Sequence, residues 1–171
     1  RLEALAACVA PERVIPTTLE VVDIAGLVKG ASQGEGLGNQ FLSHIFAVDA
    51  LLHVVRGFSD GDVAHPMGSV DPLRDIEVIA TELLLKDLEI VSRRKEKEHK
   101  LAKGGEPSAV QLTARLERWH DALSAGTPIR RLGLSCDEDP KVFGIDLLSA
   151  KPVLYVCNVG ESDVPALDNP L

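Results

Sequence analysis

Apolar residues recur along this chain with two different spacings, which predict an alternation of strands and helices. Short, largely apolar runs at residues 19–25 (LEVVDIA), 51–58 (LLHVVRGF) and 152–159 (PVLYVCNV) predict strands, because turn-forming residues bound them. A helix is expected over residues 39–48, with Asn39 as its cap. Strands that alternate with helices favour an α/β fold built on a parallel sheet.

The middle of the chain has a helical period instead. From Asp71 to about Lys103, apolar residues recur every three or four positions and form one stripe. A second amphipathic helix is expected from Ser108, which we expect to cap it, to about residue 125. Two such helices joined by a Gly-Gly-Glu-Pro turn predict an antiparallel hairpin, because neither helix buries its stripe alone.

Composition narrows the class of protein. The 171 residues are 45% hydrophobic and carry a formal net charge of -8, which favours a globular chain over one whose whole surface follows nucleic acid. No reading of DNA sequence is expected. Cys8, Cys136 and Cys157 contain no C-x-x-C pair, so neither a disulfide framework nor a zinc site is expected, and a cytoplasmic compartment fits best. No apolar run reaches the length of a membrane span, so no membrane partner is expected.

The two ends of the chain suggest an excerpt from a longer protein. It begins at Arg1 without an initiator Met and stops at Asn169-Pro170-Leu171 without a closing element. We therefore expect that segments outside this sequence contribute to function.

The first motif with a chemical interpretation is Asp23-Ile24-Ala25-Gly26, a D-x-x-G sequence before a glycine-rich stretch over residues 26–38. One reading is a plain strand end and its turn. The other is a phosphate switch, in which Asp23 holds magnesium through water and the Gly26 amide meets the terminal phosphate of a nucleotide.

The second motif, Asn158-Val159-Gly160-Glu161, also follows a predicted strand. It is similar to the N-K-x-D element with which nucleotide switches read the base, with Glu161 in the last position. A carboxylate accepts two hydrogen bonds from guanine, whereas adenine offers one donor and one acceptor, so a Glu with altered reach weakens the case for guanine. A strand-to-loop turn of small polar residues is the alternative.

A third feature is a basic end on the hairpin of an otherwise acidic chain. The cations at this end outnumber its two acidic residues, Glu96 and Glu98. These cations are Arg93, Arg94, Lys95, Lys97, Lys100 and Lys103. A solvated helix end is one interpretation, and contact with RNA phosphates is the other.

Three further patterns are set aside. Gly34 to Gly38 lacks the spacing of a dinucleotide-binding loop and begins well after the strand has ended. Ser149-Ala150-Lys151 spells a base-binding element of GTPases but precedes its strand. The five histidines lack the spacing of metal ligands, so surface or packed positions are expected for them.

Three separated blocks together resemble one family, the Obg-like ATPases of the YchF type. They are VVDIAGLVKGASQGEGLGNQFLSHI, VDPLRDIEVIATELLLKDLE and AKPVLYVCNVGESD, and with the hairpin they cover nearly the whole chain. The resemblance implies a Ras-like P-loop nucleotide domain with a coiled-coil insertion and a later TGS domain. It also implies slow hydrolysis of ATP, with GTP possible, and association with ribosomes.

Carried over by position, the resemblance assigns Asp23 to magnesium, Gly26 to the γ-phosphate, and Asn158, Val159 and Glu161 to the base. Leu27 stands where Ras-like proteins carry a water-orienting glutamine, so the catalytic group is unknown and turnover is expected to be weak. The chain contains no G-x-x-x-x-G-K-S/T phosphate loop, and its switch threonine is not identifiable.

The expected architecture is an incomplete Ras-like nucleotide-binding sheet interrupted by a hairpin. Residues 1–70 are expected to form its first part, residues 71–140 the insertion, and residues 141–171 the return to the sheet. The parent protein is expected to be a P-loop hydrolase, and the excerpt alone inactive. One alternative is a non-catalytic binding module that acts through its hairpin. The other is an Obg-type GTPase, against which Glu161 argues.

Overall fold

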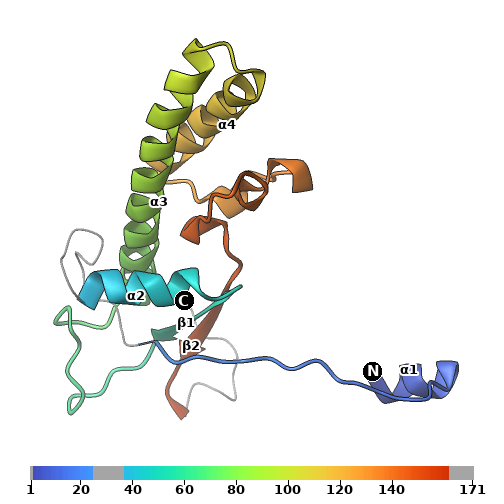
Figure 1. Ribbon diagram of the computed structural model, residues 1–171. Helices are drawn as coiled ribbons and strands as arrows, with labels where there is room; N and C mark the ends of the chain where they lie inside the picture. The colour runs from blue at the N-terminus through green and yellow to red at the C-terminus, as the bar shows by residue number, and fades with distance from the viewer. Residues whose placement is uncertain (1, 25–36, 162–171) are drawn as a thin grey trace.

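The computed structural model describes residues 2–24 and 37–161, with the side chains of residues 37–40 left aside. Figure 1 shows a long helical hairpin standing on a small parallel sheet. The helices and strands, in chain order, are α1 (Leu2–Val9), α2 (Leu37–Phe46), β1 (Leu51–Arg56), α3 (Pro72–Lys103), α4 (Pro107–Ser124) and β2 (Val153–Asn158). Four short 3-10 helices lie between α4 and β2, namely η1 (Ile129–Arg131), η2 (Cys136–Glu138), η3 (Pro140–Phe143) and η4 (Leu148–Ala150).

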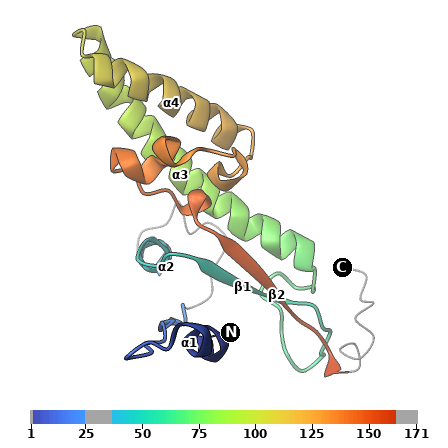
Figure 2. The same cartoon turned by 90° about the vertical axis from the view of Figure 1, so that its right-hand side faces the viewer.

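The sheet consists of β1 and β2, which run parallel and side by side (Figure 2). Their register pairs Leu51 with Val153 and Arg56 with Asn158. Parallel neighbours need a long crossover, and the whole hairpin lies within that crossover here. The strands predicted at residues 51–58 and 152–159 are therefore confirmed, each a little shorter than expected, and so is the α/β class.

The strand predicted at residues 19–25 is wrong for the part of it that the structure describes. Residues 19–24 form no strand, and Leu19, Val21 and Val22 are 88%, 74% and 51% exposed. A strand satisfies its backbone only through a neighbour, and neither β1 nor β2 pairs with this segment. Apolar content alone was therefore not sufficient to form a strand here.

Helix α2 differs in its start from the expected residues 39–48. It begins at Leu37, so Asn39 lies inside the helix and does not cap it. Leu37 and Gly38, expected to end the glycine-rich stretch, belong to the helix, and residues 25–36 lie outside the described residues. Packing of Leu42 and Ile45 in a buried cluster holds the helix in place.

The two hairpin helices are present where the apolar stripes predict them. Asp71 caps α3, since its carboxylate accepts a hydrogen bond from the Arg74 amide at 3.1 Å, and Pro72 occupies the first turn. Helix α4 begins at Pro107 with Glu106 at its cap position, so the expected cap at Ser108 is wrong. The Ser108 hydroxyl donates to the Glu106 side chain at 3.0 Å instead.

Two buried clusters hold the molecule together. The larger joins the hairpin to the returning chain and contains Val91, Leu112, Leu116, Trp119, Leu123, Ile129, Ile145 and Leu147. The smaller joins α2 to the lower part of α3 and to η4 through Leu42, Ile45, Leu83 and Leu148. The hairpin is thus packed on both the 3-10 segment and α2. Among the described residues, no helix combines the length and apolarity needed to cross a membrane.

Candidate functional site

The carboxyl ends of β1 and β2 form one edge of the sheet, and Asn158 lies there. In the register of the sheet it stands opposite Arg56, and its carbonyl accepts a hydrogen bond from the Gly57 amide at 2.7 Å. A Cβ atom on Gly57 would come within 2.7 Å of the Cys157 sulfur, so a larger residue here would have to displace that sulfur. Ligands of open parallel sheets bind beyond this type of edge.

The predicted base-reading residues lie together beyond this edge. Asn158 ends β2 and is exposed, Val159 is half-buried, and Glu161 is exposed. Both polar side chains are therefore accessible from solvent. An Asn followed three residues later by a carboxylate offers a donor, an acceptor and two further acceptor oxygens, which suits the polar edge of a purine.

Of the predicted phosphate-side residues, only Asp23 lies within the described part of the chain. Asp23 is exposed in the extended segment before residue 25, and no hydrogen bond or ion pair joins it to Asn158 or Glu161 in the described part of the chain. Gly26 and Leu27 lie outside the described residues. The structure therefore places Asn158 and Glu161 near each other after β2, and the assignment of both halves of the site stays a prediction.

Asp23 fits the chemistry of a magnesium contact, because an exposed carboxylate oxygen suits a cation that keeps several of its waters. Within residues 2–24 and 37–161, no group of three or more His, Cys, Asp or Glu side chains is placed to hold a metal ion.

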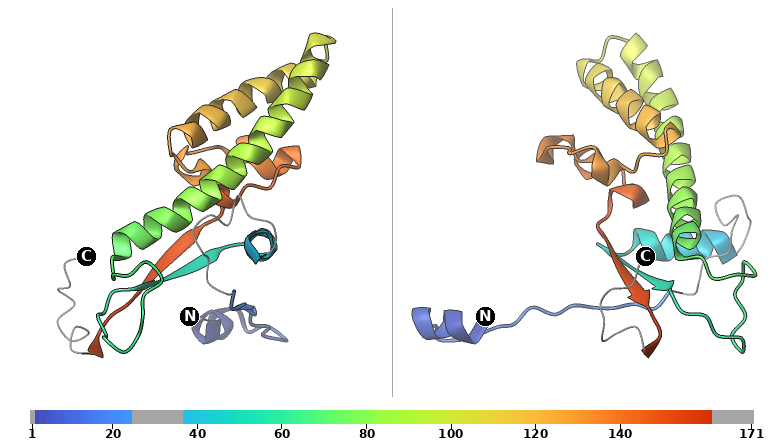
Figure 3. Two further views of the ribbon diagram at one scale, coloured as in Figure 1. Left: turned by 90° about the vertical axis from the view of Figure 1, so that its left-hand side faces the viewer. Right: turned by 180° about the vertical axis from the view of Figure 1, so that it is seen from behind.

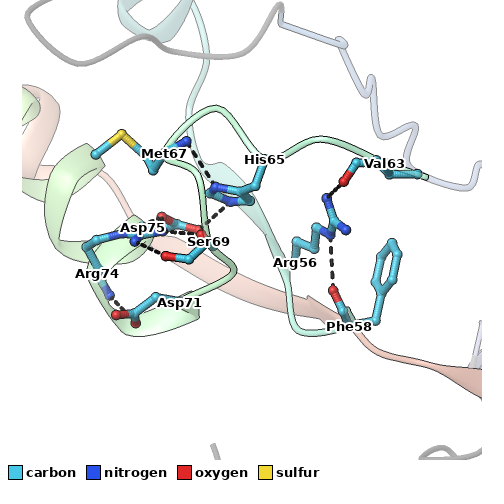
Figure 4. Close-up of polar contacts among 9 residues, drawn as sticks. All are labelled: Arg56, Phe58, Val63, His65, Met67, Ser69, Asp71, Arg74 and Asp75. Atoms are coloured by element: carbon cyan, nitrogen blue, oxygen red, sulfur yellow. Dashed lines mark hydrogen bonds and ion pairs between the residues drawn. The ribbon is translucent and has the colours of Figure 1, made fainter. Parts of the chain in front are cut away.

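The loop after β1 is organised by Arg56, which the sequence analysis did not single out. Its guanidinium donates to the carbonyl oxygens of Phe58 at 3.1 Å and Val63 at 3.0 Å (Figure 4). It also donates to the Asp60 carbonyl at 3.3 Å. It also lies over the Phe58 ring at 4.7 Å. A cationic side chain at the end of an apolar strand was the sequence signal for this role.

The far end of the same loop is fastened to the first turn of α3. His65 Nε2 lies 2.9 Å from Asp75 Oδ2, while His65 Nδ1 accepts from the Met67 amide at 3.1 Å. Because Nδ1 accepts, the ring proton is on Nε2 and points to Asp75. Arg74 bridges the other Asp75 oxygen at 3.0 Å to the Ser69 carbonyl at 2.6 Å (Figure 4).

These contacts shape an open pocket of about 400 Å³ beside the edge of the sheet, lined in part by Arg56, Asp60, His65 and Ser69. Nearby, in β1, burial lowers the pKa of His53, and the Asp75 carboxylate opposes that shift. The His53 ring lies 5.5 Å from that of Tyr155 on β2. The neutral imidazole is therefore favoured at this position of the sheet.

The basic residues of the hairpin fall into two groups. Arg93 pairs with Glu89 at 2.5 Å, and Arg94 pairs with the buried Glu98 at 2.9 Å. Hydrogen bonding to Lys86 is the main cause that lowers the pKa of Glu89. Lys95, Lys97 and Lys100 form no ion pair within the described residues, and the last two are exposed. Of the cations predicted to contact RNA, the lysines thus have the greater freedom to do so.

The sequence of this chain is similar to those of known proteins. The model of the family described as 50S ribosome-binding GTPase matches residues 9–97. A relative named Ribosome-binding ATPase YchF from Bacillus subtilis (strain 168) is 46% identical over 164 residues, which is 96% of this chain and 45% of that protein. Its namesake from Haemophilus influenzae is 47% identical over 161 residues, covering 94% of this chain and 44% of that protein.

A solved structure gives the same result in three dimensions. The structure of the Schizosaccharomyces pombe YchF GTPase superposes with a TM-score of 0.76 at 40% sequence identity, covering 98% of this chain and 46% of that one. The chain therefore spans less than half the length of the relatives that it matches.

Proposed function

The chain belongs to the 50S ribosome-binding GTPase family, and from this membership we propose that it forms part of a nucleotide-dependent ATPase switch that acts on the ribosome. The expected likeness to YchF-type Obg-like ATPases and the expected P-loop α/β fold are both confirmed by relatives that match along nearly the whole chain. The observation that carries the proposal is this match combined with Asn158 and Glu161 at the carboxyl edge of parallel strands.

In this proposal Asn158, Val159 and Glu161 hold the base of ATP, or of GTP with lower preference. Asp23 holds Mg²⁺ through water, and the Gly26 amide meets the γ-phosphate. The ion would neutralise charge on the phosphates during transfer of the phosphoryl group to water. Leu27 cannot orient a water molecule by hydrogen bonding, so the parent protein hydrolyses nucleotide slowly unless another group assists.

The hairpin supplies the contact with the ribosome in this proposal. It acts as a coiled coil whose lysines Lys95, Lys97 and Lys100, aided by Arg93 and Arg94, approach phosphates of ribosomal RNA. Residues 1–70 and 141–171 belong to the nucleotide domain, and residues 71–140 form the insertion. Such a protein works in the cytoplasm.

The test is a titration of the full-length protein with labelled ATP and GTP in the presence of magnesium, repeated with the Glu161→Asp variant. Preference for ATP in the wild type and a gain of about tenfold or more in GTP affinity in the variant are expected, because a hydrogen-bonding group of the base that is buried on binding and left unpaired costs about 1 to 3 kcal/mol. Glu117→Gln, an exposed carboxylate on α4, is the matched control and leaves both affinities unchanged.

Two other outcomes of this titration would favour one of the alternative functions. A wild-type preference for GTP identifies an Obg-type GTPase. Binding of neither nucleotide removes the switch and leaves a module that acts through its hairpin, for which the unpaired lysines would be the working surface.

A further inference from the structure

Asp87, on the hairpin helix α3, is a fully buried carboxylate that the proposed site does not use. It is 0% exposed, and its two oxygens accept hydrogen bonds from the Leu148 amide at 2.8 Å and the Ser149 amide at 2.6 Å. These amides begin η4, the short helix just before β2, where backbone N–H groups lack helical partners. Asp87 therefore ties the hairpin to the chain that enters the second strand.

Lys151 ties the same segment to a different helix. Its side chain is 3% exposed, and its amino group donates to the carbonyl oxygens of Phe46 at 3.0 Å and Val48 at 2.7 Å. Phe46 is the last residue of α2 and Val48 lies two residues beyond it, where carbonyl groups lack helical donors, and the lysine satisfies both. The Asp146 carboxylate lies 3.6 Å from the same amino group.

Apolar packing joins the same three elements. Leu42 and Ile45 of α2, Leu83 of α3 and Leu148 of η4 form one buried cluster. In the left view of Figure 3 the first turns of α3 lie away from α2, so the two helices meet through the part of α3 around Leu83 and through η4. A displacement of α2 would therefore act on α3 through the apolar cluster and, through residues 148–151, by hydrogen bonds.

The other side of the segment is held by the chain that follows α4. The Ser149 hydroxyl accepts from the Ile129 amide at 3.3 Å, and its carbonyl accepts from the Arg130 guanidinium at 3.2 Å. Residues 148–151 are therefore bonded to α2, to α3 and to the segment after α4. Burial raises the pKa of Asp87 to about 6, against the opposing hydrogen bonds of Ser149 and Leu148, so its charged form is held at a cost.

We propose that residues 148–151 are a coupling junction through which α2 and the hairpin helix α3 change position together. In sequence, α2 follows the D-x-x-G segment, so the junction would carry the nucleotide state of that segment to the hairpin; the inference rests on the proposed switch function. Asp87 binds the junction from α3, and Lys151 belongs to the junction and binds the end of α2, so both act as positioning residues in this proposal. Coupling of this type needs an element with contacts to both moving parts, and residues 148–151 have them.

The test is hydrogen–deuterium exchange on the full-length protein with magnesium and either a non-hydrolysable ATP analogue or ADP. The variants are Asp87→Asn and Lys151→Met. Their matched controls are Glu77→Gln, on the exposed face of α3, and Lys141→Met, an exposed lysine of the 3-10 segment. Nucleotide binding by each protein is measured first in a separate titration.

In the wild type and the controls, exchange in both α2 and residues 76–90 of α3 is expected to differ about fivefold or more between the two nucleotides. In the two variants the difference in α2 is retained and the difference in α3 is lost. If Asp87→Asn reduces helicity, Lys151→Met still tests the junction, because it leaves the bonds of Asp87 in place.

Two results would overturn the junction while leaving the nucleotide function intact. One is a wild-type protein that binds nucleotide and changes exchange in α2 without any change in α3. The other is a pair of variants that retain the α3 difference in full. Failure of the wild type to bind nucleotide overturns the proposed function itself, and the junction with it.

Discussion

The hairpin helices and the segment before residue 24 both carry regularly placed apolar side chains, but they bury them to different extents. On α4, Leu116 and Trp119 are 0% and 1% exposed, whereas Leu19 and Val21 are 88% and 74% exposed. A helix satisfies its own backbone and needs one packing partner, which the hairpin turn supplies nearby in sequence. A strand needs a neighbour for its backbone as well as cover for its faces.

These two regions are expected to differ most in how much stability the protein loses when one apolar side chain is removed. In the 171-residue chain, Trp119→Ala is expected to lower the free energy of unfolding by about 3 to 5 kcal/mol, because it empties the centre of the larger buried cluster. Leu19→Ala is the control and is expected to change it by less than about 0.5 kcal/mol. Urea unfolding followed by circular dichroism measures both, and equal effects would contradict the contrast.

The next effect concerns the buried carboxylate at the junction. The pKa of Asp87 is raised from 3.8 to about 6 in the folded protein, so the folded state binds this proton more tightly than the unfolded state. Stability from this group is present at low pH and is lost as pH rises through about 6. Other carboxylates titrate as well, so the wild type is compared with Asp87→Asn at each pH.

The difference in unfolding free energy between wild type and Asp87→Asn is expected to move against the wild type by roughly 2 to 3 kcal/mol from pH 4 to pH 7.5. Urea titrations at both pH values measure it. A difference that does not change with pH would show that burial does not perturb this carboxyl.

A smaller effect tests the close approach of the two strands. Gly57→Ala is expected to cost about 1 to 3 kcal/mol, because the added methyl group would lie within 2.7 Å of the Cys157 sulfur. Gly61→Ala, which places its methyl group in open space, is expected to be neutral. Adding Cys157→Ala to Gly57→Ala should recover most of the lost stability, and a lack of recovery would place the clash elsewhere.

The smallest effect separates the two helix starts of the hairpin. Asp71→Ala removes the side-chain acceptor of the Arg74 amide and is expected to cost about 1 kcal/mol. Ser108→Ala is expected to cost only a few tenths, because its hydroxyl bonds an exposed Glu106 side chain and caps no amide. Thermal unfolding of both variants measures the difference, and the reverse order would restore Ser108 as a cap.

Local patterns predicted those parts of the fold that local physics determines. The apolar stripes located α3 and α4, and the bounded apolar runs located β1 and β2. The cap at Asp71 followed from its own side chain and the proline after it. The cap expected at Ser108 is wrong because Pro107 fits the first turn of a helix, so the helix begins one residue earlier than Ser108.

The parts that sequence reasoning missed depend on contacts between distant residues. Asp87 binds amides of residues 148 and 149, and Lys151 binds carbonyls of residues 46 and 48. One signal was present in the pattern, since Asp87 lies at helical spacing from Leu84 and Val91 on the apolar stripe. A charge on such a stripe indicates a buried polar contact, but it cannot name the partner.

In the candidate site, too, local patterns predicted some parts, and contacts between distant residues determine the others. The strand that ends at Asn158 could be placed from its apolar run, and its edge position follows from the parallel pairing. The hydrogen bonds of Arg56 and the contact between His65 and Asp75 could not be predicted from the sequence, because a loop of this composition has many alternative conformations of similar free energy.

The proposed function requires that nucleotide state governs binding to the ribosome. Its most direct test is co-sedimentation of the full-length protein with 50S subunits in the presence of magnesium and either a non-hydrolysable ATP analogue or ADP. Affinities that differ about fivefold or more between the two nucleotides, and that weaken in both states when Lys97 and Lys100 are changed to Glu, are the predicted result. Equal affinity with either nucleotide would rule out a nucleotide-dependent switch on the ribosome, whatever the strength of binding.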